Sequence, residues 1–282
     1  MIVVSLRRLF TALLRPAFGV LAVLWTIFPS AYVYAEDCPD NFRVGASDDY
    51  EPFSYIGSDG KLTGLDLMFV EQILGEAGCT PQFLDLPFPR AMVELAAGRI
   101  DMMMFASVTA ERQNFALFSA PYRNETAGLI IRAHDQGRYP ITEVWDLLKL
   151  NLLLAHDVGT YRGDLFETFL ANPEAKKNII QVSSSRQSLN MLVKGRINAI
   201  VEAPAAVFAL AETVGVRDQI AEHPFKLWSE PVHFMFSRKT VSPEFVAQID
   251  ALLAEAVQTP EYTSQFGSMS VGSPAHAGSE TN

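Results

Sequence analysis

The sequence contains little cysteine and more acid than base. Two cysteines among 282 residues exclude a disulfide-dense scaffold. Lysine and arginine total 22 against 32 aspartates and glutamates, and this balance argues against a nucleic-acid partner, because phosphate binding needs a basic surface. Glycine and proline follow no fixed period, which excludes a collagen-like chain. Because 49% of the residues are hydrophobic, the chain is expected to build one large core or two medium ones rather than remain disordered.

Signatures of catalysis and of metal binding are also missing. The chain has no G-x-S-x-G nucleophile turn, no phosphate-binding loop of the Walker type and no H-E-x-x-H zinc motif. Its five histidines are scattered without the spacing of metal ligands, and Met102–Met104 is expected to be sheet core. We therefore predict no catalytic residue, no metal and no cofactor, and a binding function rather than an enzyme.

The first 35 residues have the pattern of a secretory signal. Arg7, Arg8 and Arg15 precede an apolar run at 17–28, which is shorter than a membrane span, and Ala35 ends an A-x-A-like cleavage site. We expect cleavage after Ala35 and a soluble periplasmic protein; the alternative is an uncleaved anchor. The signal carries three arginines and no acid, so the remaining chain would be more acidic than the formal charge of -10.

Export would make the two cysteines a pair. Cys38 precedes a strand-like run at 42–45, and Cys79 precedes another at 82–84. If these are neighbouring parallel strands, both cysteines lie at the same edge of the sheet, and a disulfide between them is expected in an oxidising compartment. Two separate, partly buried thiols are the alternative.

Short apolar strands alternate with amphipathic helices, which predicts an α/β fold with largely parallel sheets. Helices are expected at 64–77 and 90–97, ending at Gly78 and Gly98. A weak repeat relates 95–101 to 192–198: in both segments a helix ends on glycine, a basic residue follows and a strand begins. The repeat indicates two similar lobes. Residues 268–282, rich in Ser, Gly and Ala, are predicted to be a disordered tail.

The binding signals lie after predicted strands. Ser107 to Arg112 follows a strand at 102–105, where open α/β sheets place their ligands, and Thr109 is expected to cap a short helix beside the Arg112 guanidinium. Such an arrangement suits a carboxylate. Gly159 and Thr160, before a helix expected near Tyr161, offer a second helix start of the same kind.

An ordered series of short motifs extends from about residue 40 to residue 267. The motifs stand at 42–45, 50–55, 60–66, 98–101, 109–112 and 118–122. In this order they resemble the amino-acid-type (family 3) extracellular solute-binding proteins of bacterial ABC transporters. The resemblance implies a two-lobed, type II periplasmic binding protein, with lobes at 36–128 plus 233–267 and at 129–232, two hinge crossovers near 126–132 and 229–236, and a ligand cleft between the lobes.

The resemblance also implies roles for individual residues. Arg112 matches the arginine that grips the ligand carboxylate, and Ser107 and the backbone of Phe105 match its hydrogen-bonding neighbours. The other matching positions are Tyr50 and Phe88, which would pack on the ligand side chain, and Gly159 and Thr160, which would form the turn of the second lobe. The implied partners are a small amino acid or related carboxylate and an ABC permease in the inner membrane, and the protein is expected to be a monomer.

The acids of the family pattern differ in this chain. Ser47 stands where many members have an aspartate, and the acid that pairs with the ligand ammonium is either replaced by Glu202 or lost at Ala203. The ligand is therefore expected to be an amino acid held through Glu202 or an anion without an amine. Arg90 and Arg162 would add positive charge to the cleft, although a solvated surface position is the favoured interpretation of both.

Two other functions stay open. The scaffold is compatible with recruitment as a dehydratase-like periplasmic enzyme, in which Glu202 and Arg90 would do acid–base work. It is also compatible with a sensory ligand-binding protein that acts on a separate receptor.

Overall fold

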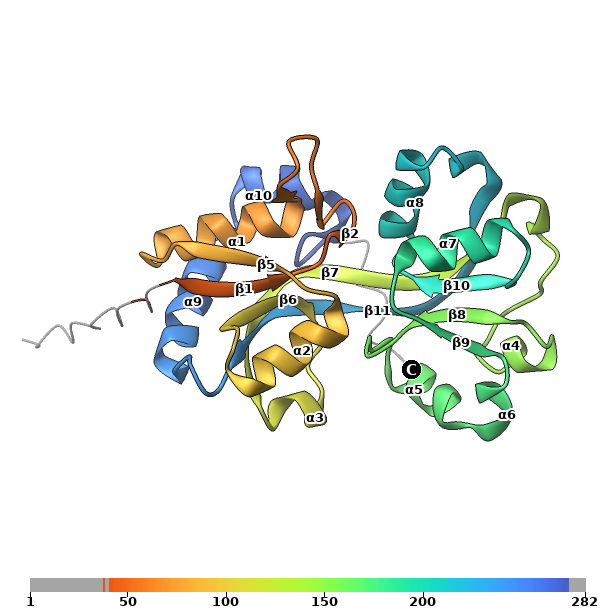
Figure 1. Ribbon diagram of the computed structural model, residues 1–282, viewed down its shortest axis with the longest axis horizontal. Helices are drawn as coiled ribbons and strands as arrows, with labels where there is room; N and C mark the ends of the chain where they lie inside the picture. The colour runs from red at the N-terminus through yellow and green to blue at the C-terminus, as the bar shows by residue number, and fades with distance from the viewer. Residues whose placement is uncertain (1–37, 39–40, 274–282) are drawn as a thin grey trace, which may run out of the picture. The chain divides into compact units, whose positions relative to one another are not determined.

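The computed structural model describes residue 38 and residues 41–273, and the expected signal at 1–35 lies outside them. An eight-stranded mixed sheet in the order β5-β1-β6-β11-β7-β10-β8-β9 forms its centre (Figure 1), and β2, β3 and β4 form a second sheet. The strands are β1 Phe42–Ala46, β2 Asp49–Tyr50, β3 Ser54–Ile56, β4 Leu62–Thr63, β5 Pro81–Asp85, β6 Met102–Ala106, β7 Ala116–Arg132, β8 Leu154–Asp157, β9 Ile179–Val182, β10 Ala199–Glu202 and β11 Ile220–Ser237.

Helices connect and flank these strands. The α-helices are α1 Leu65–Glu76, α2 Phe88–Ala97, α3 Ala110–Gln113, α4 Asp146–Lys149, α5 Asp164–Ala171, α6 Pro173–Lys176, α7 Ser185–Val193, α8 Pro204–Thr213, α9 Pro243–Ala256 and α10 Pro260–Phe266. Short 3-10 helices are η1 Ala133–Asp135, η2 Arg217–Gln219 and η3 Gly267–Met269. Among the helices of this described part, none combines the length and the apolar character that a membrane span requires.

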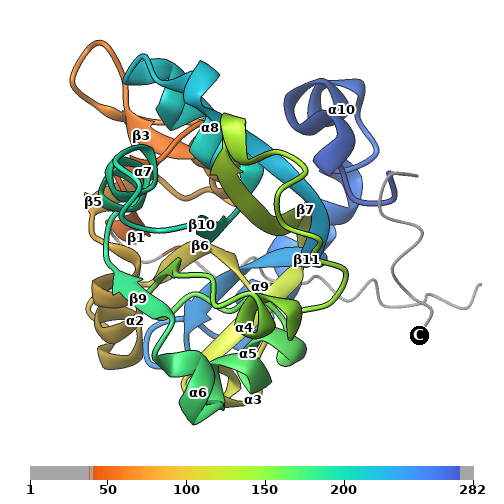
Figure 2. The same cartoon turned by 90° about the vertical axis from the view of Figure 1, so that its right-hand side faces the viewer.

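Two long strands, β7 and β11, run through both halves of the sheet. They pair antiparallel from Ala116↔Ser237 to Arg132↔Ile220, with bulges between (Figures 1 and 2). The parallel strands β1, β5 and β6 lie on one side of this pair, and β8, β9 and β10 lie on the other. At the middle, the hydroxyls of Thr126 and Ser229 are hydrogen-bonded at 2.9 Å.

Separate apolar cores pack on the two halves of the sheet. The largest cluster in the first half packs α1, α9 and α10 around Phe69, Phe234 and Phe266, all at most 1% exposed. In the second half, Phe166 and Phe169 of α5 pack against β7, β8 and β10, and a further cluster packs α7 and α8 on the same strands. The expected α/β fold with two lobes is confirmed.

The internal repeat marks the same turn in each lobe. Gly98 and Gly195 have positive φ angles of 76° and 68°, a conformation that favours glycine. Each glycine is followed by a strand that pairs with one of the two long strands, β6 with β11 and β10 with β7. The Asp101 carboxylate accepts a hydrogen bond from the backbone of Arg43 in β1, and the Asn198 amide oxygen accepts one from the backbone of Leu153 before β8, both at 2.8 Å.

Helix positions agree with the sequence except at the start of α5. α1 and α2 match the helices expected at 64–77 and 90–97, although α2 begins two residues earlier, where Pro89 fits the first turn. The helix expected near Tyr161 is present as α5, but it begins three residues later, at Asp164. Gly163 at its start has φ 88°, and a Cβ added there would lie 2.6 Å from Trp228 Cδ1. Packing against Trp228 therefore sets this helix start.

The end of the described chain differs from the expected tail. Residues 267–269 form η3, the Asn124 side chain donates to the Ser270 carbonyl at 2.9 Å, and the backbone of Val271 donates to the Tyr262 hydroxyl at 2.7 Å. The prediction of disorder was therefore wrong for 268–273, because its composition did not reveal these long-range contacts. Residues 274–282 lie outside the described residues.

The disulfide is confirmed. Cys38 and Cys79 are bonded, with their Cα atoms 5.4 Å apart. The cause is the one expected: β1 and β5 are adjacent parallel strands with Phe42 opposite Pro81, so the segments that precede them begin at the same edge of the sheet. The bond closes a loop that contains α1.

Removing the disulfide is expected to destabilise the protein. Replacing both Cys38 and Cys79 by serine should lower the unfolding free energy by about 4 kcal/mol, because the unfolded chain regains the entropy of an open loop of this length. Urea denaturation of the wild-type and double-variant proteins measures the difference. A reducing agent should lower the wild-type midpoint and leave the variant unchanged. Equal midpoints for the two oxidised proteins would contradict a stabilising role.

Candidate functional site

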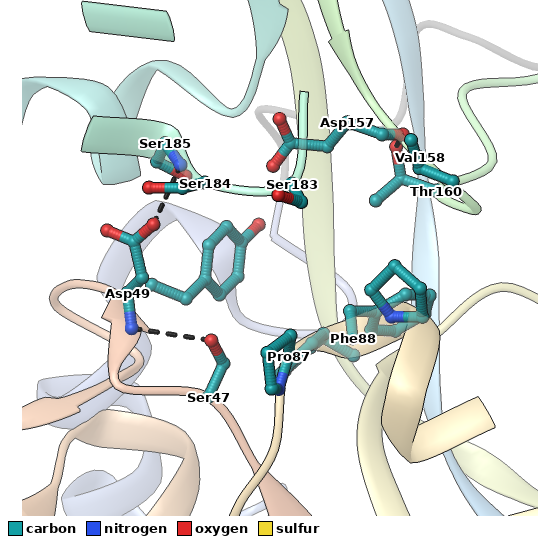
Figure 3. A pocket seen from close by; sticks show the side chains of 13 residues that line it. Ser47, Asp49, Pro87, Phe88, Asp157, Val158, Thr160, Ser183, Ser184 and Ser185 are labelled. Atoms are coloured by element: carbon teal, nitrogen blue, oxygen red, sulfur yellow. Dashed lines mark hydrogen bonds between the residues drawn. The ribbon is translucent and has the colours of Figure 1, made fainter. Parts of the chain in front are cut away.

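A cavity lies where strand ends of the two lobes face each other (Figure 3). Its walls are formed by the segments that follow β1 and β5 and by the end of β6 on one side, and by the ends of β8 and β9 on the other. The carboxyl ends of parallel strands meet here, which is the position where α/β sheets bind ligands. The lining residues are Ser47, Asp49, Tyr50, Pro87, Phe88, Pro89, Phe105, Asp157, Val158, Thr160, Ser183, Ser184 and Ser185.

Three aromatic rings form an apolar wall of this cavity. The ring centroid of Phe105 lies 5.0 Å from that of Tyr50 and 5.7 Å from that of Phe88. Phe105 has a positive φ of 44°, which is strained for a residue with a Cβ, and its backbone N–H is 3.2 Å from the Tyr122 hydroxyl. The sequence indicated these three residues, but their contact with one another requires the tertiary fold.

Arg112 lies beside this cavity. Thr109 caps α3 as expected, its hydroxyl accepting from the backbone of Arg112 at 3.2 Å. The Arg112 guanidinium donates to the Ser107 carbonyl at 2.9 Å. It also donates to the carbonyl of Gly159, which lies in the other lobe, at 3.0 Å. Arg112 is 6% exposed. Burial, followed by the charge of Arg162, lowers the pKa of Arg112 to about 10.

A second cavity adjoins the first, and the two share Pro89 and Thr160. The expected ligand-binding residues are therefore divided between the two cavities. Tyr50, Phe88, Phe105 and Thr160 line the first cavity; Arg112, Gly159 and Thr160 line the second. Ser107 and Glu202 line neither of these two, and both are buried.

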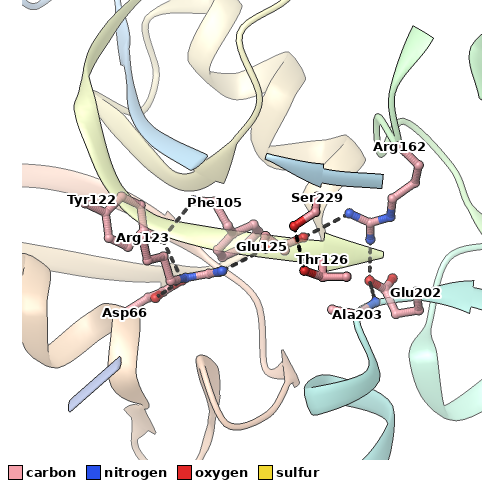
Figure 4. A network of polar contacts seen from close by, with 10 residues as sticks. All are labelled: Asp66, Phe105, Tyr122, Arg123, Glu125, Thr126, Arg162, Glu202, Ala203 and Ser229. Carbon is pink, nitrogen blue, oxygen red and sulfur yellow. Dashed lines mark hydrogen bonds and ion pairs between the residues drawn. The ribbon is translucent and has the colours of Figure 1, made fainter. Parts of the chain in front are cut away.

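Five buried charged residues form a chain between the lobes (Figure 4). Arg123 pairs with Asp66 at 2.9 Å and with Glu125 at 3.0 Å, and Arg162 pairs with Glu125 at 3.0 Å and with Glu202. No side chain in the chain is more than 6% exposed. Because positive and negative groups alternate, each buried charge has an opposite partner, which its burial requires.

Arg162 was expected at the surface, and that expectation was wrong. Its side chain, 6% exposed, reaches Glu125 and Glu202, which are 37 and 40 residues away in the sequence. Arg90 matches its expected surface position: its side chain is 62% exposed and pairs with Glu94. Glu202 is therefore occupied within the protein, since its Oε1 also accepts from the backbone of Ala203 at 2.7 Å.

Asp157 is a cavity residue that the sequence analysis missed. Burial, with Glu202 and Asp49 adding like charge, raises the pKa of Asp157 to about 7, although Arg162 opposes the shift. The neighbouring His156 lines the other cavity, as expected for consecutive side chains of a strand. Burial and the charge of Arg162 lower the pKa of His156 to about 3. The signal was present, because Asp157 follows the apolar run 152–155 just as Ser107 follows 102–105.

Asp49 joins the two sides of the first cavity. One of its carboxylate oxygens accepts from the backbone N–H of Ser185, the first residue of α7, at 2.7 Å (Figure 3). A negative side chain at a helix N-terminus is favourable, because the first N–H groups of a helix lack partners in the helix. The residues between 41 and 273 contain no cluster of three or more histidine, cysteine or acidic side chains that could hold a metal ion.

The chain belongs to the bacterial extracellular solute-binding proteins, family 3, whose model matches residues 42–266. A probable amino-acid-binding protein of Bacillus subtilis is 25% identical over 76% of this chain and 77% of its own length. A cyclohexadienyl dehydratase of Pseudomonas aeruginosa is 30% identical over 37% of this chain and 39% of its own length. An ancestral arginine-binding protein bound to glutamine has the same fold, with a TM-score of 0.69 and 20% identity over 82% of this chain and 97% of that one.

Removing Arg162 is expected to leave two buried carboxylates without their shared partner. Arg162→Met should lower the unfolding free energy by about 3–5 kcal/mol, the usual cost of breaking a buried ion pair on one side. Arg90→Met is the matched control, because it breaks an exposed pair worth less than about 1 kcal/mol. Equal losses in urea denaturation would contradict the buried chain.

Asp157→Asn is expected to change how stability depends on pH. The pKa of Asp157 is raised in the folded protein to about 7 from 3.8, so the folded state binds more protons between these values and its stability falls as the pH rises through this window. The variant lacks this loss and should be more stable than wild type by roughly 2–4 kcal/mol at pH 8. At pH 4 the difference should be small. Thermal unfolding across this range measures it, and a pH-independent difference would contradict the shift.

Proposed function

We propose that the protein is a receptor that closes on a small amino acid or related carboxylate and delivers it to an ABC permease. The observation that carries this proposal is the buried guanidinium of Arg112. Within 41–273, both other guanidinium groups that are as deeply buried, those of Arg123 and Arg162, pair with carboxylates, whereas Arg112 contacts backbone carbonyls. Glu111 and Glu167 line the same cavity as Arg112, but neither forms a described ion pair with it, so a carboxylate ligand would supply a direct charged partner.

The contacts of Arg112 also give a reason for closure. The guanidinium has five N–H donors, and the two described hydrogen bonds join it to Ser107 in one lobe and to Gly159 in the other. A carboxylate bound to the remaining donors would lie beside the turn that holds Gly159 and Thr160. Contacts made from both lobes stabilise the closed form relative to the open one, and the permease would recognise that form.

This position of the carboxylate suggests roles for other residues of the site. We assign Tyr50, Phe88 and Phe105 to the ligand's apolar part, and Ser107 and Thr160 to hydrogen bonding beside Arg112. The lobes are proposed at 36–128 plus 233–267 and at 129–232, which places the crossovers within β7 and β11. Secretion through a signal cleaved after Ala35 would bring the receptor to the periplasm, where such a permease collects its solute.

A second function, catalysis by the same site, is favoured by one observation. Asp157 lines the cavity with a pKa raised to about 7, the range that suits a general acid or base, and one relative is a dehydratase. The expected pair of Glu202 and Arg90 does not support it, because Glu202 binds Arg162 and Arg90 binds Glu94. Incubation with each compound that binds, followed by mass spectrometry, separates the two functions: a receptor returns the compound unchanged.

Arg112→Ala is expected to weaken binding by roughly 100-fold, because a carboxylate loses its charged hydrogen-bond partner. The measurement is calorimetric titration of the protein lacking residues 1–35 with the standard L-amino acids and small organic acids, after any bound compound has been removed by unfolding and refolding. Arg90→Ala, at an exposed site, is the matched control and should bind like wild type. Unchanged affinity in folded Arg112→Ala would refute the assigned anchor.

A further inference from the structure

Glu202 is poorly placed to receive a ligand ammonium group. It is 3% exposed, lines neither of the two cavities described above, and is occupied by Arg162 and by the backbone of Ala203. Both described contacts of Glu202 use its Oε1. An ammonium group bound to the same carboxylate would compete with Arg162 for its negative charge and leave that buried guanidinium with less compensation. If the ligand carries a positive group, another residue is expected to hold it.

The first cavity has the electrostatic character that a cation needs. Its lining includes two carboxylates, Asp49 and Asp157, and none of the lining residues is lysine, arginine or histidine. Its aromatic wall adds the negative faces of π systems, which attract ammonium groups. An anionic group placed in this cavity would face two acids, so the cavity favours the positive end of a ligand.

Tyr50, which lines the same cavity, has a buried hydroxyl without a described partner. Tyr50 is 9% exposed, and its Oη has no hydrogen-bond partner among the described residues. Buried hydroxyls are nearly always hydrogen-bonded, so this one points to a polar group supplied by a ligand. A phenol oxygen accepts a hydrogen bond from an ammonium group as readily as it donates to an acceptor.

Of the two carboxylates, that of Asp157 has fewer contacts within the protein. Asp49 accepts from Ser185, whereas the Asp157 carboxylate accepts no described hydrogen bond and forms no described ion pair. Asp157 also stands two residues before Gly159, whose carbonyl accepts a hydrogen bond from Arg112. The Cα atoms of Asp157 and Gly159 are therefore at most about 7 Å apart. The acceptor for an ammonium group thus lines the first cavity and the anchor for a carboxylate lines the second, and the two cavities meet at Pro89 and Thr160.

We propose that Asp157, with Asp49 beside it, holds the ammonium group of the ligand, and that Glu202 does not. The inference rests on the proposed function and names its ligand class: α-amino acids rather than acids that lack the amine. It resolves the choice that the sequence left open at Glu202 and Ala203 by moving the ammonium site to the end of β8.

The surroundings of Asp157 add a consequence for pH. The charges of Glu202 in β10, Arg162 in the loop before α5 and Asp49 in β2 act on Asp157, and Tyr50 lines the same cavity. Burial and its acidic neighbours raise the pKa of Asp157 to about 7, and a bound ammonium would favour the ionised form. Ligand binding would then release a proton near neutral pH, and affinity would rise between pH 6 and pH 8.

The experiment compares amino acids with matched acids that lack the amine. The L-amino acid that binds wild type most tightly in calorimetric titration is paired with the L-2-hydroxy acid of the same side chain, as L-phenylalanine is paired with L-phenyllactate. Wild type should prefer the amino acid by roughly 30-fold. Asp157→Asn should lose most of this preference and its pH dependence. Glu202→Gln should keep the preference, while the pH at which affinity rises should fall, because the charge of Glu202 helps to raise the pKa of Asp157. Asp48→Asn, the same change at an exposed neighbour, is the control.

Each outcome decides between the possibilities. A preference that survives in Asp157→Asn and disappears in Glu202→Gln overturns the inference, as does equal wild-type affinity for the amino acid and the hydroxy acid; both leave the carboxylate receptor intact. A wild-type protein that binds no amino or organic acid overturns the proposed function and this inference with it. Asp49→Asn, which should weaken the preference partially, provides the second reading if Asp157→Asn does not fold.

Discussion

The pairing of β7 with β11 is the constraint on which the rest of the molecule depends. Because both strands continue from one lobe into the other, the lobes share one sheet, and the parallel strands on the two sides end toward each other. The segments after β1 and β5 and the end of β6 therefore meet those after β8 and β9. No single segment forms the cavity, since its walls come from segments spread between Ser47 and Ser185 that these two strands bring together.

Charge burial at this junction follows a strict pattern. The chain from Asp66 to Glu202 alternates in sign, so its members compensate one another although nearly all their surface is removed from water. Arg112 is also buried, but its described hydrogen bonds go to neutral carbonyls, and its guanidinium lies 5.6 Å from the centroid of the Phe88 ring. The contrast separates charges that maintain the structure from a charge that is available to a ligand, and it explains why the conspicuous acid Glu202 is the less suitable ligand partner.

The local chemistry of the site differs from the acidity of the whole chain. The second cavity presents the guanidinium of Arg112, and the first presents the carboxylates of Asp49 and Asp157. Such a division of charge suits a zwitterion. Relatives on this fold include an amino-acid-binding protein and a dehydratase, so the fold alone does not select a function, and the arrangement of these few side chains must do so.

The sequence alone determined what local patterns and strand order control. The spacing of apolar residues predicted α1 and α2, the glycines predicted the turns at Gly98 and Gly195, Thr109 was recognised as a helix cap, and the positions of the cysteines before adjacent parallel strands predicted their bond. The ordered motifs predicted the family. Each of these features depends on neighbours in the chain or on the order of the strands.

Only the tertiary structure decided which charged groups meet. The partners of Arg162, the start of α5 at Gly163, the contacts of 268–273 and the exposure of Asp157 to the cavity all depend on residues tens to more than a hundred positions away. A buried arginine and a solvated one look alike in a sequence, because burial is a property of the packed lobes. The physical reason is that the electrostatic energy of a charged group depends on the groups that surround it in space. These surroundings are set only when β7 and β11 bring the two lobes together.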